Sequence, residues 1–259
     1  MSVKKSCFMI VVSLCVCGML WSCGGSTDTN NNNTNANTNT NTNNNAPDTG
    51  KPSRAEDAKF TEPETKVEFD GYMKVRGSDN KHFFMGTGLR TKTILQIKIY
   101  VIGFFVDVVK GREALKPWKG KSKEDLQKDN TYYDKLLNGA FGKSLRLVMV
   151  YGVDKKTMAD AFAESLQPRI DKLQGAAKEA AMNDLVTFKG FFDKDLVDKD
   201  VIQMIWLEDG TLHAEINGEL KGSIKNADFA KAMFDVYLGA EPISEGAKKD
   251  FVSGMSDLY

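Results

Sequence analysis

The arginine at position 90 is the side chain in this sequence whose surroundings best suit a chemical role. It follows Gly86-Thr87-Gly88 and precedes an apolar run that begins at Ile94. A guanidinium group can bind a carboxylate through two parallel hydrogen bonds, so Arg90 could hold an acidic ligand. It could also pair with a carboxylate of its own domain. Taken alone, the residues favour that structural role.

Other residue combinations that support catalysis or cofactor binding are missing from the sequence. Its two histidines, His82 and His213, are far apart and lack neighbours typical of a metal site. The chain has no Cys–His or Ser–His–Asp arrangement. Gly86-Thr87-Gly88 lacks the third glycine and the following helix of a dinucleotide-binding loop. The sequence therefore predicts neither a cofactor nor a metal.

Cys23 is the other residue that suggests a specific chemistry. It ends a leader that has Lys4 and Lys5 near its start and an apolar run between Cys7 and Leu20. Such a leader is too short for a membrane-spanning helix and is typical of a signal peptide. All four cysteines lie at or before this point, so cleavage before Cys23 leaves a chain without internal disulfides.

The residues around Cys23 resemble the lipobox of bacterial lipoproteins. Leu20 supplies the apolar position and Ser22 the small residue, although Trp21 departs from the usual small residue between them. The resemblance implies cleavage after residue 22 and lipidation of Cys23, which would anchor the protein in a membrane. Gly24 follows where an inner-membrane retention signal has aspartate, so we expect the outer membrane. An ordinary secretory signal with a chance cysteine is the alternative.

Composition divides the remaining chain into two parts. Residues 23–64 begin with a tract of Asn and Thr and continue with polar and charged residues, which predicts a disordered tether. Residues 65–259 have a globular composition, and their number suits one domain. Basic and acidic residues each number 35, which argues against a nucleic-acid partner.

The hydrophobic patterns of the globular part indicate a mixture of strands and helices. Strands are predicted at 67–75, 82–87, 94–109, 145–151, 201–207 and 211–216. Helices are predicted at 122–137, 155–188, 226–238 and 244–253. Gly103 suggests a bend in its strand, and Asp209-Gly210 suggests a hairpin turn. The stretch 155–188 is expected to be helical in two pieces, with a break or kink at Pro168. This order of elements indicates an α+β fold.

Three motifs, taken in order, resemble the chalcone isomerase family. They are Gly86–Arg90 with the strand Lys98–Phe105, the hairpin Trp206–Thr211, and a tail from Phe229 through Leu238-Gly239 to Ser244 and Lys248. The resemblance extends from about Phe69 to Gly254. It implies an open-faced β-sandwich, in which a layer of helices covers a large antiparallel sheet and a ligand lies in an apolar cleft between them.

The resemblance also implies roles for single residues. Arg90 matches the arginine that holds the acidic end of the ligand. Tyr100 lies at about the position of a tyrosine that joins this arginine in fatty-acid-binding members, although a half-buried structural tyrosine is the alternative. The ring-closing enzymes have threonine there and use a tyrosine before a mid-chain helix. Tyr151 and Val153 match that position about equally well.

Three hypotheses follow. The favoured one is a membrane-tethered protein that binds a fatty acid or similar amphipathic carboxylate through Arg90 and Tyr100. The second is an isomerase or lyase that acts on a phenolic or enone substrate, with Tyr151 as its catalytic residue. The third is a structural lipoprotein whose own side chains fill the cleft. Tyr100 and the lack of a clear general base favour binding over catalysis.

Overall fold

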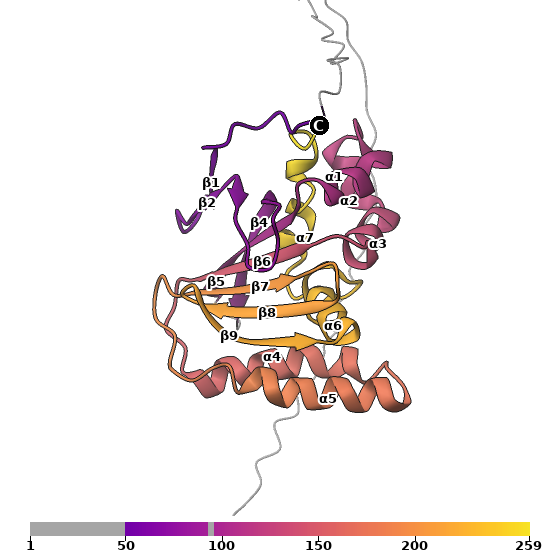
Figure 1. The fold of residues 1–259 in the computed structure, drawn as a ribbon. Coiled ribbons are helices and arrows are strands. Elements are labelled where there is room, and N and C mark those ends of the chain that lie inside the picture. Colours follow the sequence, from indigo (N-terminus) through magenta and orange to yellow (C-terminus); the bar gives the residue numbers. More distant parts are fainter. Residues whose placement is uncertain (1–49, 93–95) are drawn as a thin grey trace, which may run out of the picture. The chain divides into compact units, whose positions relative to one another are not determined.

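A seven-stranded antiparallel sheet forms the centre of the fold (Figure 1). The computed structural model describes residues 50–92 and 96–259. The strands lie in the sheet in the order of the sequence, so each pairs with its neighbour along the chain. They are β3 (Tyr72–Met73), β4 (His82–Lys92), β5 (Ile97–Asp107), β6 (Lys143–Met149), β7 (Val201–Trp206), β8 (Thr211–Ile216) and β9 (Glu219–Lys225).

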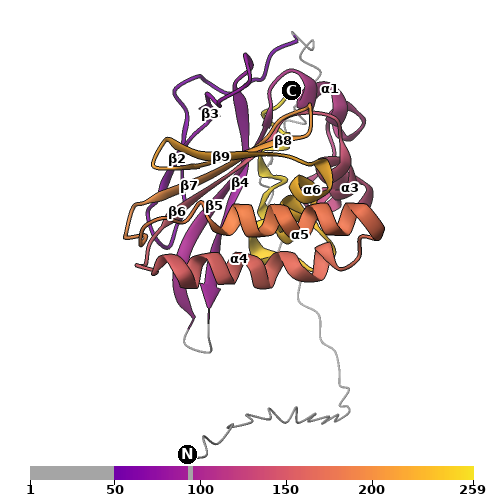
Figure 2. The ribbon, with the colours of Figure 1, turned by 60° about the horizontal axis from the view of Figure 1, so that its bottom comes forward.

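Helices form a layer against one face of this sheet, and α4 and α5 run antiparallel along it (Figure 2). The helices are α1 (Lys110–Leu115), α2 (Lys123–Lys128), α3 (Asn130–Asn138), α4 (Lys155–Ile170), α5 (Gly175–Lys189), α6 (Ala227–Leu238) and α7 (Glu245–Asp250). Alternate residues of β5, such as Ile102 and Phe104, pack with buried residues of α6, such as Phe229 and Phe234, in the main core. The predicted α+β open-faced sandwich is therefore confirmed.

The opposite face of the sheet is partly covered as well. Strands β1 (Lys59–Thr61) and β2 (Glu68–Asp70) form a separate two-stranded sheet. Its Phe69 packs with Phe84, Val101 and Phe105 of the main sheet in a small second cluster. Because β5 is buried on both faces, nearly all of its residues are apolar, and the sequence shows no alternation there.

Gly103 gives room to this second cluster. A Cβ atom at this position would lie 2.6 Å from Cε1 of Phe69, which is closer than real contacts allow. Strand β5 continues without interruption through Gly103. The close approach of an aromatic ring accounts for the glycine, and the predicted bend stays a prediction.

The folded part begins earlier than the predicted boundary at Thr65. The Arg54 side chain is only 3% exposed and forms an ion pair of 3.0 Å with Asp257. Its guanidinium also lies over the rings of Phe60 and Phe83. Residues 50–64 are thus part of the fold. Arg54 and Phe60 make contacts with the domain that the polar composition of this segment does not reveal. Residues 23–49 of the predicted tether lie outside the described residues.

Several predicted elements differ in detail. The two helical pieces predicted between 155 and 188 are confirmed as α4 and α5, but α4 continues past Pro168 and ends at Ile170. The predicted helix 122–137 is two helices, because Asp129 caps α3 by accepting hydrogen bonds from two backbone amides. Strand β9 was missed because it is a largely polar strand at the edge of the sheet. The hairpin at Asp209-Gly210 and the helix caps at Asn226 and Ser244 are confirmed.

Candidate functional site

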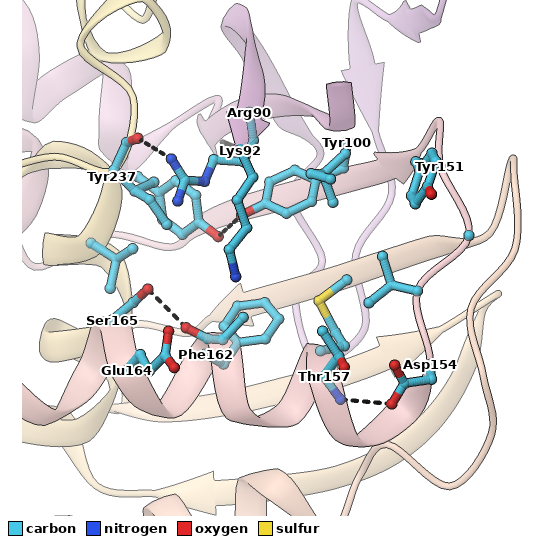
Figure 3. Close-up of a pocket in the computed structure, with 17 residues that line it drawn as sticks. Arg90, Lys92, Tyr100, Tyr151, Asp154, Thr157, Phe162, Glu164, Ser165 and Tyr237 are labelled. Carbon is cyan, nitrogen blue, oxygen red and sulfur yellow. Dashed lines mark hydrogen bonds between the residues drawn. The ribbon is translucent and has the colours of Figure 1, made fainter. Parts of the chain in front are cut away.

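A pocket of about 300 Å³ lies where one end of strands β4 and β5 meets α4 and α6 (Figure 3). Most of its surface is apolar, with a few polar groups, as is usual for sites that bind small amphipathic molecules. The lining residues are Arg90, Lys92, Ile99, Tyr100, Tyr151, Gly152, Val153, Asp154, Thr157, Met158, Ala161, Phe162, Glu164, Ser165, Val236, Tyr237 and Ile243.

Two glycines of β4 bring α7 close to the strand just before the pocket. A Cβ atom at Gly86 would lie 2.1 Å from the carbonyl oxygen of Asp250, and one at Gly88 would lie 2.3 Å from Cα of Ala247. The Gly-x-Gly motif therefore serves helix–strand packing, because only glycine leaves room for the helix backbone. Between the two glycines, the Thr87 amide donates a hydrogen bond to the Asp250 carboxylate at 3.0 Å.

Arg90 holds the segment between α6 and α7 against β4. Its Nη1 donates a hydrogen bond of 3.0 Å to the carbonyl oxygen of Ile243. The Ser244 hydroxyl donates a second bond of 3.0 Å to the carbonyl oxygen of Leu89. No carboxylate among the described residues pairs with Arg90, so the internal ion pair considered above is not seen in this part of the chain. Within residues 50–92 and 96–259, the bond to Ile243 is the one hydrogen bond that the guanidinium donates, so its other N–H groups could serve a ligand.

Tyr100 lies directly opposite Arg90 on the neighbouring strand. Its hydroxyl is 3.3 Å from the hydroxyl of Tyr237, which comes from α6 on the helical side of the pocket. Burial raises the pKa of both phenols, and the nearby Arg90 cation partly opposes this increase. The two hydroxyls therefore stay protonated and can act as hydrogen-bond donors. The sheet, through Tyr100, and the helix layer, through Tyr237, thus each contribute a hydroxyl group to the same end of the pocket.

Tyr151 occupies the other end of the pocket. Figure 3 shows it on the far side of Tyr100 from Arg90. It is 53% exposed and lies between β6 and α4. Val153, the alternative match, also lines the pocket and pairs with Leu196 through a backbone bridge. Both residues thus share the pocket with Arg90, and Tyr151 lies at its opposite end.

Tyr237 and Lys92 are among the pocket residues with polar groups that were not predicted as site residues. Tyr237 belongs to the tail motif and lies among the apolar residues of α6, so its pattern suggested core packing. Lys92 lies two residues after Arg90 on β4 and resembled a surface lysine at the end of a strand. The register of β4 and β5 would have shown that Lys92 lies on the same face as Arg90. The position of Tyr237 can be known only from how α6 packs on the sheet.

The remaining buried titratable groups lie outside this pocket. The His82 ring is 2.8 Å from the Ser144 hydroxyl, and burial lowers its pKa to about 4. The Lys143 ammonium donates to the carbonyl oxygens of Leu137 and Gly139 at the end of α3. Burial lowers its pKa to about 7. No cluster of metal-binding side chains is found in residues 50–92 and 96–259. No helix in that same part has the length and apolar character needed to cross a bilayer.

Comparison with known proteins shows which family and which solved structure this chain resembles. Residues 126–252 match the chalcone isomerase-like family, a stretch that contains Tyr151 and Tyr237 but not Arg90 or Tyr100. The crystal structure of a fatty-acid binding protein from Arabidopsis thaliana superposes with a TM-score of 0.65 at 23% identity. The superposition covers 78% of this chain and 98% of the plant chain. Residues 126–252 therefore resemble the chalcone isomerase-like family, and the superposition shows that the fold is the same.

Curated relatives include binding proteins and an enzyme. The chain is 32% identical to fatty-acid-binding protein 2 of Arabidopsis thaliana over 197 residues, which are 73% of this chain but only 49% of that protein. It is 23% identical to fatty-acid-binding protein 1 of the same plant, covering 78% of this chain and 72% of that protein. A chalcone–flavanone isomerase of Oryza sativa subsp. japonica is 29% identical over 39% of this chain and 47% of the enzyme. Because one fold serves both functions, the site must decide between them.

Proposed function

We propose that this protein binds a fatty acid or a similar amphipathic carboxylate in the pocket described above. The observation that carries this proposal is the meeting of Arg90, Tyr100 and Tyr237 at one end of a largely apolar pocket. The names of the two Arabidopsis relatives state fatty-acid binding for those proteins, which supports the same class of ligand here.

The donors at this end suit the acceptors of a carboxylate. A carboxylate has two oxygens with about four acceptor positions and can accept two parallel hydrogen bonds from a guanidinium. Arg90 uses Nη1 to donate to the Ile243 carbonyl and keeps other N–H groups for the ligand. The hydroxyls of Tyr100 and Tyr237 would then donate to the same head group. These bonds would replace the hydrogen bond of 3.3 Å between the two hydroxyls.

The apolar lining suits the hydrocarbon part of such a ligand. Ile99 and the α4 residues Met158 and Phe162 continue the pocket away from the tyrosine pair. Transfer of each methylene group from water to such surroundings contributes about 0.8 kcal/mol. Recognition would therefore combine a directional polar head with a tail held by burial.

The two other hypotheses have less support. A purely structural protein would fill its cleft and neutralise its arginine, but the pocket is open and Arg90 has no carboxylate partner within residues 50–92 and 96–259. An isomerase needs an acid or base near the reacting atoms. The hydroxyl-bearing Tyr151 is exposed and distant from the arginine end of the pocket.

Native mass spectrometry with lipid extraction tests the binding proposal on the full chain. We expect the wild-type protein to retain decanoate when it is offered. Arg90→Ala should bind decanoate at least ten times more weakly, because the substitution removes a charged hydrogen-bond donor to the carboxylate. Lys59→Ala is the matched control, since Lys59 pairs with Asp70 on the exposed surface away from the pocket. Wild-type protein that stays empty with all fatty acids offered would refute the proposal.

We further propose that Cys23 is lipidated and anchors the protein in the outer membrane of a bacterial envelope. The leader and the lipobox-like residues before Cys23 support this, and Cys23 itself lies outside the described residues. Labelling with an alkyne-bearing fatty acid should mark the wild-type chain and Cys17→Ser but not Cys23→Ser. Labelling that persists in Cys23→Ser would refute the assignment. Separation of inner and outer membranes then tests the location.

A further inference from the structure

A second cation, Lys92, lies at the head-group end of the pocket beside Arg90. The two residues are separated by one position on β4, and both line the pocket. In Figure 3 the Lys92 side chain runs from β4 toward α4, across the space between the tyrosine pair and Phe162. This part of the pocket therefore carries two positive charges that reach it from the same strand.

Neither cation is neutralised by the described part of the protein. No carboxylate in residues 50–92 and 96–259 forms an ion pair with Arg90 or Lys92, whereas nearby Lys98 pairs with Glu64 at 3.0 Å. Two carboxylates line the pocket. Asp154 accepts a hydrogen bond from the Thr157 amide as the cap of α4, at the end where Tyr151 lies.

The other carboxylate, Glu164, is on α4 and is exposed to solvent. It forms no ion pair with Lys92. Figure 3 shows Glu164 beside Ser165, on the side of the pocket where Tyr237 and Lys92 lie, so two cations face one exposed carboxylate there and the positive charge is in excess by one. A ligand with one negative charge would be held by Arg90 and leave Lys92 without a partner.

We propose that this pocket prefers amphiphiles with a doubly charged head group, and specifically alkyl phosphate monoesters, over the corresponding carboxylates. The inference rests on the proposed function, because it assumes that the apolar part of the pocket takes a hydrocarbon chain. A phosphate monoester carries a charge of about −1.5 to −2 at pH 7 and three strong acceptor oxygens. Arg90, Lys92 and the tyrosine pair supply two cations and two hydroxyl donors to match it.

Titration calorimetry with ligands of one chain length tests this preference on the full chain. We expect wild-type protein to bind decyl phosphate about five times more tightly than decanoate, as one added and partly exposed ion pair implies. Decyl methyl phosphate keeps the phosphorus but carries a single charge, so it should bind like decanoate. Lys92→Gln should reduce the ratio of the two affinities from five to about one. Lys92→Arg keeps the positive charge and should keep the fivefold ratio. Lys59→Ala should leave the ratio unchanged.

The outcomes separate this inference from the proposed function. If decanoate binds in a manner that depends on Arg90 but decyl phosphate binds no more tightly, the preference is refuted and the binding function stands. A ratio that persists in Lys92→Gln refutes the role of Lys92. If neither ligand binds, the proposed function itself fails. Glu164→Gln should raise the affinity for decyl phosphate, because it removes a negative charge from the pocket lining, and an unchanged or lower affinity would count against the preference.

Discussion

Arg90 and Tyr100 are directly opposed residues of the neighbouring antiparallel strands β4 and β5, and both side chains line the same pocket. Their proximity is a property of strand register, because residues opposite each other across such a pair have side chains on the same face. A shift of one residue would send one of them to the other face. The polar end of the pocket therefore depends on the pairing that the rest of both strands establishes.

The tyrosine pair predicts a non-additive effect on stability. Tyr100→Phe or Tyr237→Phe alone leaves the other buried hydroxyl without its 3.3 Å partner, and each should lower the free energy of unfolding by about 1–2 kcal/mol. The double variant removes both hydroxyls, so it should cost about 1 kcal/mol less than the sum. Urea denaturation of the four proteins measures this coupling. Strictly additive losses would show that the two hydroxyls do not interact.

Gly88 should tolerate no larger side chain. In Gly88→Ala the new Cβ would lie 2.3 Å from the Cα and Cβ atoms of Ala247, so either α7 or β4 must shift. Overpacking of this kind costs about 1–3 kcal/mol. We expect a lower unfolding midpoint in urea and weaker decanoate binding, since Arg90 follows on the same strand.

Gly246 on α7 offers the matched control. No atom lies within 4 Å of a Cβ placed there, and the residue is exposed in the helix. Gly246→Ala should therefore raise the free energy of unfolding by about 0.5–1 kcal/mol through helix propensity. If both alanine variants change stability equally, the close approach of α7 does not explain the Gly-x-Gly motif.

His82 predicts a loss of stability in mild acid. Burial lowers its pKa to about 4 in the folded protein, opposed by nearby Asp107, whereas the unfolded value is 6.5. Between these values the unfolded chain binds a proton that the folded protein does not. The free energy of unfolding therefore falls as pH decreases from 6.5 to 4, by about 3 kcal/mol from this residue. His82→Gln should flatten the pH dependence in this window, and an unchanged slope would contradict the assignment.

Tyr151 provides the test of the enzyme hypothesis. Its hydroxyl-bearing side chain is 53% exposed and far from the polar end of the pocket, so it is poorly placed to transfer a proton in a closed site. We expect no cyclisation of a chalcone above the rate in buffer, followed by absorbance. Turnover by the wild-type protein that disappears in Tyr151→Phe would establish an isomerase instead.

Local patterns in the sequence were sufficient for much of the fold. Asp209-Gly210, Asn226 and Ser244 are signals that act within a few residues, and the structure has the predicted turn and helix caps there. The surroundings of Gly103 and the exact end of α4 after Pro168 could not be read from the local sequence. The glycine responds to Phe69, which is distant in sequence, and the proline lies where packing of α4 continues the helix for two more residues.

The site was predicted only in part. Arg90 and Tyr100 were identified through family resemblance, and the structure brings both to one pocket, while their role in binding a ligand stays a prediction. Tyr237 could not be singled out, because its approach to Tyr100 depends on how α6 docks on the sheet. Lys92 has no local signal that separates it from a solvated lysine. Contacts between layers are the information that a single sequence does not provide.

The contacts of Ser53 and Arg54 with Asp257 join the two ends of the fold and have a mechanical consequence. The Ser53 amide donates to the Asp257 carbonyl at 2.9 Å, and Arg54 binds both Asp257 and the carbonyl oxygen of Phe84. Tension applied to the chain before residue 50 is therefore taken up by the C-terminal segment and by the end of β4 opposite Arg90. If the chain is anchored through Cys23 as proposed, a pull on the anchor would enter the fold at the end of β4 that is distant from the head-group end of the pocket.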